Sequence, residues 1–296
     1  MGRTAFAPAK VNLFLHVAGP GADGFHPICS LMAFADVGDL VSTFEAEALS
    51  LRVAGPFARD LEGEGDNLVL RAARALIAEA RRPVAPIGLS LEKLLPVASG
   101  LGGGSSDAGA ALRLLREVLA LKIDNGRLEA LAAALGADGA ACLWGAPMIA
   151  QGRGERLSSA PGLPPLDAVL VNPRTPVSTA EVYRRFDAGG RFSDVSPPAA
   201  PEAFEDATEL AAWLALQRND LEAAAIATAP AVGAVLETLA GEPEALLARV
   251  SGSGGTCFAL CASDIEAESL AERIEAIAPG WWVRRCRLGG PWPDPA

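Results

Sequence analysis

The chain has 296 residues, half of them apolar, and carries 36 Asp and Glu residues against 25 Lys and Arg, for a net charge of −11. This length suits about two domains of roughly 150 residues each, and the apolar content excludes an intrinsically disordered chain. Such an acidic protein has no general attraction for nucleic acid or for an anionic membrane surface, so an anionic ligand must be bound through local geometry.

The first half of the chain mixes strand and helix signals. Apolar residues alternate over 5–17 with a period of two, which is typical of a strand, whereas their spacing over 68–80 is helical. In chain order we expect a strand at 5–17, a turn at 19–27, strands within 28–54, a helix at 68–80, a strand at 87–94, a helix from about 106, a helix at 128–135 and a strand at 140–152.

The second half follows a segment rich in Pro and Gly at 159–167, which we interpret as a boundary between domains 1–158 and 159–296. In chain order we then expect a strand at 168–171, a helix at 179–186, a polar loop at 189–206, helices within 208–240, a glycine turn at 251–255, a strand at 257–261, a helix at 264–278 and a strand at 281–288. This mixture favours an α+β fold over regular βαβ alternation. The last strand is a candidate to return to the N-terminal domain.

Cysteine and histidine are scarce. The five cysteines include no C-x-x-C pair, which predicts reduced and mostly buried thiols, and the two histidines argue against a zinc site. The first ten residues lack the apolar core of a signal peptide, and no stretch approaches the roughly 18 apolar residues that span a bilayer. These features predict a cytoplasmic protein.

The strongest chemical signal is the segment GLGGGSSD at 100–107, with four glycines in five residues. Glycine is unfavourable inside helices and strands, so this segment predicts a loop whose free backbone N–H groups lead into a helix N-terminus. Such a loop binds phosphate through its N–H donors and the helix dipole. It is not a Walker A loop, because no Lys follows the glycines, and G-x-G-x-x-G fails because position 105 is Ser.

Three further segments carry weaker signals. Lys10 is a lone cation in an apolar strand, either facing an anionic partner or reaching solvent at a sheet edge. Asp138 lies between small residues, as a ligand-facing carboxylate or an ordinary turn or cap residue. The glycine turn at 251–255 approaches either a ligand or a neighbouring backbone. Asp107, in the first turn of the helix expected after the loop, either stabilises the helix dipole or holds Mg²⁺.

Taken in order, APAKVNLFL, PVASGLGGGSSDAGAAL and VSGSGGTCF resemble the three motifs of the superfamily named for galactokinase, homoserine kinase, mevalonate kinase and phosphomevalonate kinase (GHMP). The resemblance covers most of the chain. It implies a two-domain α+β fold, with an N-terminal ribosomal-protein-S5-like domain, a C-terminal ferredoxin-like domain and the active site in the cleft between them. ATP and Mg²⁺ are the implied cofactors.

Three segments, GADGFHPICSL, LGAD and RNDLE, resemble one branch of this superfamily. That branch phosphorylates the 2-hydroxyl of a diphosphocytidyl-methylerythritol in the non-mevalonate route to isoprenoids. Two alternatives stay open: another GHMP kinase, acting on a mevalonate, homoserine or sugar substrate, or a catalytically silent nucleotide-binding module. The resemblance leaves open whether the protein is a monomer or a homodimer.

The resemblance assigns roles residue by residue. Lys10 and Asp138 match the catalytic pair, with Asp138 as general base. The segment that matches the ATP phosphate loop comprises Pro96, Val97, Ala98, Ser99, Gly100, Leu101, Gly102, Gly103, Gly104, Ser105 and Ser106. Ser105 and Ser106 are the candidate Mg²⁺ ligands. The residues that match the substrate side are Asn12, Phe25, His26 and Tyr183. Phe25 stands where the family commonly has Tyr, so stacking can persist without a hydroxyl contact.

Overall fold

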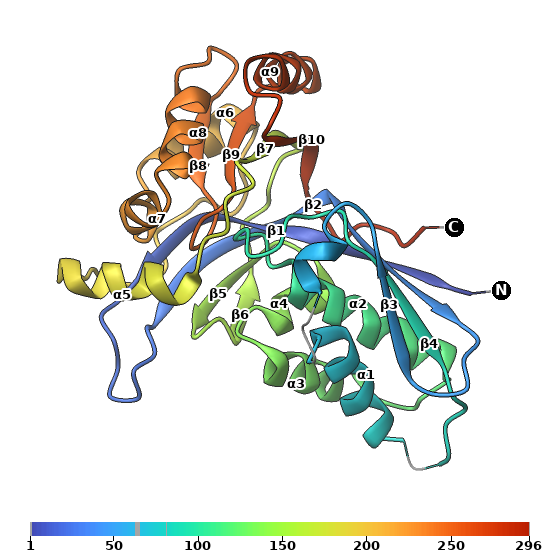
Figure 1. Cartoon of the computed structure of the whole chain (residues 1–296). Coiled ribbons are helices and arrows are strands. Elements are labelled where there is room, and N and C mark those ends of the chain that lie inside the picture. Colours follow the sequence, from blue (N-terminus) through green and yellow to red (C-terminus); the bar gives the residue numbers. More distant parts are fainter. Residues whose placement is uncertain (1, 63–65, 81, 296) are drawn as a thin grey trace.

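The computed structural model describes residues 2–62, 66–80 and 82–295, and within these ranges ten strands form one mixed sheet (Figure 1). Its main path runs β3-β4-β2-β10-β7-β9-β8, while β1 and β5 also pair with β2, and β6 pairs with β5. The strands are β1 (Thr4–Val17), β2 (Ile28–Phe44), β3 (Ser50–Ala54), β4 (Gly88–Glu92), β5 (Met148–Gly152), β6 (Arg156–Ser159), β7 (Leu166–Asn172), β8 (Leu247–Val250), β9 (Cys257–Cys261) and β10 (Trp282–Gly289).

Strand β2 connects the two halves of the sheet. It runs antiparallel to β1 along nearly its whole length, and it pairs with β5 at one end and with β4 at the other. Between these contacts it meets β10 at Ala35 and Phe34, and β10 then continues along β7. The C-terminal strand therefore joins both halves, and the sheet is continuous across the boundary predicted at 159. The division into domains 1–158 and 159–296 stays a prediction.

Helices cover the sheet in two groups, one in each half of the chain (Figure 1). They are α1 (Leu68–Ala78), α2 (Gly103–Val118), α3 (Asn125–Leu135), α4 (Gly139–Trp144), α5 (Thr179–Gly189), α6 (Ala207–Ala215), α7 (Glu222–Thr228), α8 (Pro230–Ala240) and α9 (Asp264–Ile277), with a short 3₁₀ helix at Ala58–Leu61. Separate apolar clusters form beneath each group. None of these helices has the length and apolar character needed to cross a membrane, as judged over the described ranges. All five cysteines are buried and free, as predicted.

Most predicted elements are confirmed, but the type of one element and the starting residue of another are wrong. The segment 140–152 was expected to be a strand, but its first part is helix α4, and only β5 is extended. A short apolar run is compatible with a strand or with a buried helix. Here Gly139 allows the helix, because it has no side chain where α4 starts against α3. A Cβ at Gly139 would lie 1.9 Å from the carbonyl oxygen of Ala132, so only glycine allows α4 to start this close to α3.

Helix α2 also begins earlier than expected, at Gly103 rather than near Ser106. Two of the four glycines therefore lie in its first turn. Gly102, with φ of 63°, occupies the cap position in the left-handed region that glycine adopts without strain. A Cβ at Gly103 would lie 2.9 Å from the Lys93 ammonium, so a larger residue there would displace that ammonium. Strands β6 and β8, four residues each, were not predicted.

Candidate active site

A cavity of about 1220 Å³ opens between β1, the glycine loop, the α3–α4 turn and helix α5. Its wall contains nearly all the residues predicted for the site. The predicted residues on the wall are Lys10, Asn12, Phe25, His26, Pro96, Val97, Ala98, Ser99, Gly100, Gly102, Gly103, Gly104, Ser105, Asp138 and Tyr183. Leu101 and Ser106 lie behind the wall, both fully buried. Segments more than 170 residues apart in the sequence thus meet in one cavity.

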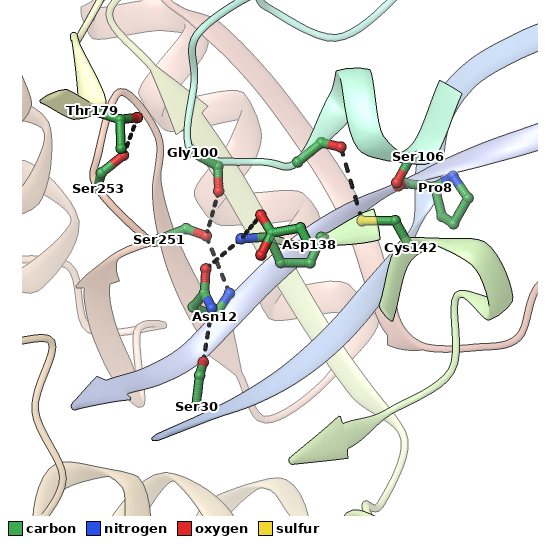
Figure 2. Close-up of polar contacts among 12 residues, drawn as sticks. Pro8, Asn12, Ser30, Gly100, Ser106, Asp138, Cys142, Thr179, Ser251 and Ser253 are labelled. Carbon is green, nitrogen blue, oxygen red and sulfur yellow. Dashed lines mark hydrogen bonds and ion pairs between the residues drawn. The ribbon is translucent and has the colours of Figure 1, made fainter. Parts of the chain in front are cut away.

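Lys10 and Asp138, which both line this cavity, form an ion pair with 3.2 Å between Nζ and Oδ2. Figure 2 marks this contact at Asp138 with a dashed line. Lys10 is only 4% exposed, so the alternative of an edge lysine reaching solvent is wrong. Asp138 occupies the cap position of α4, but its carboxylate makes no capping hydrogen bond. Its side chain stays 30% exposed and turns to the lysine. The buried ammonium of Lys10 thus holds the Asp138 carboxylate, which stays partly exposed to the cavity.

Strand β1 explains how the lysine is held. Lys10 and Asn12 lie two residues apart and therefore share one face of the strand. The Lys10 ammonium donates to Asn12 Oδ1 at 2.6 Å, and the Asn12 amide nitrogen donates to Ser30 Oγ at 2.8 Å (Figure 2). Both ends of the Asn12 amide are thus engaged within the protein. The Lys10 backbone N–H donates to the Leu101 carbonyl at 2.8 Å, at an irregularity in the β1–β2 register, and so ties the glycine loop to the strand.

The glycine loop packs against the second glycine turn, at 251–255. Gly100 has φ of 77°, and a Cβ there would lie 2.4 Å from the Ser251 carbonyl oxygen. The Ser251 hydroxyl donates to the Gly100 carbonyl at 3.2 Å and accepts the Asn12 backbone N–H at the same distance (Figure 2). Asn219, from the RNDLE segment, donates to the Val250 and Gly252 carbonyls at 2.8 Å. The turn therefore braces the loop, and its residues Gly252 and Ser253 also reach the cavity.

The two candidate metal ligands differ in orientation. The Ser106 hydroxyl is fully buried and donates to the Pro8 carbonyl at 2.7 Å (Figure 2). This contact occupies Ser106 behind the loop, away from the cavity. Ser105 lies on the cavity wall at the N-terminus of α2, where backbone N–H groups and the helix dipole favour an anion. The structure therefore favours Ser105 and not Ser106 as an oxygen ligand.

A second buried lysine, which we did not predict from the sequence, lies beside the glycine loop. Lys93, just after β4, is 3% exposed, and its ammonium donates to the carboxylates of Asp39 and Asp107. It lies against the α2 N-terminus, so a lysine does lie beside the glycine loop. In a Walker A loop the lysine follows the glycines in the sequence, whereas Lys93 precedes them. Burial, reinforced by the Asp39 charge and opposed by Lys93, raises the pKa of Asp107 to about 8. The only available signal was a lone lysine at the end of an apolar strand, as for Lys10.

The dipole-stabilising role predicted for Asp107 is wrong, while its role toward Mg²⁺ stays a prediction, because the residue lines the cavity. It lies beyond the first turn of α2, and one of its oxygens binds Lys93 at 2.8 Å. The other oxygen, Oδ1, is buried without a hydrogen-bond partner in the described structure. Two carboxylates share one ammonium in this cluster, which makes a proton on Asp107 favourable.

The opposite end of the cavity is built from aromatic side chains. The rings of His26 and Tyr183 lie 5.0 Å apart, and Phe25 is 56% exposed at the rim. His26 Nδ1 contacts the Ala18 carbonyl at 2.9 Å, and Nε2 lies 3.3 Å from Asp187. Burial raises the pKa of Tyr183 to about 12, so its phenol is neutral near pH 7. Three of the four predicted substrate residues, Phe25, His26 and Tyr183, thus line one part of the cavity, whereas the amide of the fourth, Asn12, is engaged by Lys10 and Ser30.

Two family models match the chain: the GHMP kinases N terminal domain over residues 67–146 and the GHMP kinases C terminal domain over residues 200–279. A solved homoserine kinase from Cytophaga hutchinsonii shares the fold, with a TM-score of 0.69 at 18% identity, over 98% of this chain and 94% of that one. The family models and the shared architecture identify the chain as a GHMP small-molecule kinase.

More specific relatives share much more of the sequence. The 4-diphosphocytidyl-2-C-methyl-D-erythritol kinase of a Caulobacter species is 61% identical, over 97% of this chain and 99% of the relative, and that of Hyphomonas neptunium is 50% identical, over 97% and 96%. A crystal structure of 4-(cytidine 5′-diphospho)-2C-methyl-D-erythritol kinase matches with a TM-score of 0.77 at 33% identity, covering 98% of this chain and all of that one. The chain belongs to the family of 4-diphosphocytidyl-2-C-methyl-D-erythritol kinases.

Proposed function

We propose that this kinase transfers the γ-phosphoryl group of ATP to the 2-hydroxyl of 4-diphosphocytidyl-2-C-methyl-D-erythritol. The observation that carries the proposal is the position of the Lys10–Asp138 pair, which lines one cavity with the glycine loop and with the aromatic residues. A phosphate-binding wall, a reactive carboxylate and a stacking surface for a base are the three parts that this reaction requires. The names of the relatives support the choice of substrate.

Phosphoryl transfer depends mainly on positioning and on neutralising charge. We assign the ATP phosphates to the α2 N-terminus, where Gly103 to Ser105 present backbone N–H groups. The Asp138 carboxylate accepts the proton of the acceptor hydroxyl late in the transfer, because an alcohol is far less acidic than a carboxylic acid. Lys10 orients Asp138 and stabilises the negative charge that develops on the transferred group. Asn12 acts through Lys10, since its amide is occupied by Lys10 and Ser30.

Magnesium fits this wall, because Mg²⁺ prefers oxygen ligands and Ser105 presents a hydroxyl beside the α2 N-terminus. Bound together with ATP, Mg²⁺ would neutralise negative charge on the phosphates. Ser105 would hold it from the protein side. At the other end of the cavity, Phe25, His26 and Tyr183 would hold the cytosine.

The decisive experiment is mass-spectrometric detection of phosphate transfer by the purified protein. ATP is supplied with the diphosphocytidyl substrate, mevalonate, homoserine or galactose, with and without Mg²⁺. We expect Mg²⁺-dependent transfer to the diphosphocytidyl substrate alone. Transfer to another acceptor would reassign the enzyme within the superfamily. ATP binding without turnover of any acceptor would contradict a catalytic role.

A further inference from the structure

The tip of the β1–β2 loop is fastened to the turn between β5 and β6. The Arg153 guanidinium carbon lies 4.1 Å from the centre of the Phe25 ring, and the guanidinium also pairs with the Asp23 carboxylate. Arg153 and Phe25 both line the cavity. Two segments that are 128 residues apart in sequence therefore share one stacked contact at the rim, and we call Asp23, Phe25 and Arg153 the rim clamp.

Asp23 contacts the other two members of the rim clamp. One of its oxygens accepts the Phe25 backbone N–H at 3.0 Å, while the other binds Arg153. These contacts lower the pKa of Asp23, the Phe25 N–H most strongly, so the carboxylate is charged. The Phe25 carbonyl in turn accepts the Gly21 N–H at 2.8 Å, which closes a compact turn. The loop tip thus has a defined shape, and Arg153 sets where that tip lies over the cavity.

The ring of Phe25 needs an external support. At 56% exposure it has few packing contacts, and it lacks a hydroxyl that could be anchored by a hydrogen bond. A planar guanidinium stacks on an aromatic face and attracts it electrostatically. With Arg153 on its face and Asp23 at its backbone, the ring is held at the rim of the cavity, on the side where His26 and Tyr183 lie.

We propose that Arg153 is a positioning residue for base recognition: it acts through Phe25 and sets the affinity for the cytidyl end of the substrate, and not the chemical step. This inference rests on the proposed function. Holding an aromatic side chain before the ligand arrives reduces the ordering cost of binding, so loss of the clamp weakens substrate binding. Arg153 lies at the base end, whereas ATP is assigned to the glycine loop, so the effect is confined to one substrate.

Steady-state kinetics of the full chain test this assignment. We expect Arg153→Met to raise KM for the diphosphocytidyl substrate about fivefold, the scale of an exposed cation–π contact together with its ion pair, with KM for ATP and kcat within about twofold of wild type. Arg153→Lys keeps the charge but loses the planar stack, and we expect an intermediate KM. Arg52→Met is the matched control, because Arg52 stacks on Phe44 at 3.9 Å, outside the cavity.

A double-mutant cycle separates the rim clamp from a general structural role. In a Phe25→Ala background, Arg153→Met should add less than about twofold to KM, since its partner ring is gone. Equal rises in both KM values, full additivity in the cycle, or an unchanged substrate KM in Arg153→Met would each overturn the inference. Wild-type turnover of the diphosphocytidyl substrate is measured first. Its absence would overturn the proposed function as well, whereas normal wild-type turnover confines a failure to Arg153.

Discussion

The two ends of the cavity are built by different means. At the phosphate end, the backbone forms the wall: two glycine turns pack against each other. The ion pairs of Lys10 with Asp138 and of Lys93 with Asp39 lie beside them, and both lysines are buried. At the base end, side chains form the wall, and the ion pair of Arg153 with Asp23 there is exposed. A phosphate is recognised by N–H groups in a fixed arrangement, whereas a base is recognised by the faces and edges of side chains.

This difference predicts how each end responds to substitution. Removing one partner of a buried ion pair leaves an uncompensated charge, which is costly, while an exposed pair contributes little. Substitutions that remove one partner of an ion pair at the phosphate end should therefore have large effects, on kcat or on folding. Substitutions at the base end should have smaller effects, and these should change only the KM for the diphosphocytidyl substrate.

The largest effect is expected from Asp138→Asn. The amide cannot accept the proton of the acceptor hydroxyl, so we expect kcat to fall by about 10³-fold, within the usual range for a general base. Rapid-quench measurement of a single turnover checks whether the chemical step is the one that slows. Near-wild-type kcat in a folded protein would remove Asp138 from the mechanism.

A matched pair of glycine substitutions compares the two ends directly. Gly100 and Gly24 have nearly the same φ, 77° and 79°, but a Cβ at Gly100 would meet two backbone oxygens, whereas a Cβ at Gly24 would meet nothing within 4 Å. We expect Gly100→Ala to lower the free energy of unfolding by about 3 kcal/mol, from backbone strain and overpacking together. Gly24→Ala should lower it by about 1 kcal/mol, from backbone strain alone.

Denaturant unfolding of both variants measures the difference. Equal losses would mean that the backbone conformation, and not the contact between the two glycine turns, decides the stability of the phosphate end. ATP affinity should follow the same order, because the Gly100 turn shapes the loop that we assign to the phosphates.

The sequence specified the phosphate end better than the base end, for a physical reason. The consecutive glycines by themselves indicate a phosphate site built from backbone, whereas the roles of Lys10 and Asp138 were implied by the resemblance to GHMP kinases. The pairing of Lys93 with Asp39 joins residues 54 positions apart, and no local pattern encodes it. The support of Phe25 by Arg153 depends on a loop and a hairpin turn that meet only in the folded protein.

A pH dependence follows from the Lys93 cluster. The pKa of Asp107 is about 8 in the folded protein, above its ordinary value of 3.8, so the folded state binds the extra proton between these values. The contribution of Asp107 to the free energy of unfolding is then largest below about pH 4 and declines as pH rises toward 8, because only the folded state keeps the proton in this range. Asp107→Asn, which resembles the protonated acid, should flatten this decline.

Unfolding measured between pH 5 and pH 8 checks the slope for the wild type and the variant. Asp39→Asn is the informative contrast, because one Asp39 oxygen accepts the backbone N–H groups of Leu94 and Leu95 while the other faces the ammonium. An amide there places a donor against a donor or gives up both backbone contacts. We therefore expect Asp39→Asn to destabilise the protein at every pH. Identical slopes in the wild type and Asp107→Asn would place the titrating group elsewhere.

The smallest effect is expected from Phe25→Tyr. Stacking on a base depends on the ring, and a guanidinium attracts the faces of Phe and Tyr alike, so Arg153 supports either side chain. We expect KM for the diphosphocytidyl substrate to change by less than about twofold, whereas Phe25→Leu, which removes the ring but keeps apolar volume, should raise it about tenfold. If Phe25→Tyr instead lowered KM strongly, a hydroxyl contact would outweigh the stacked ring, and the base end would depend on hydrogen bonds, as the phosphate end does.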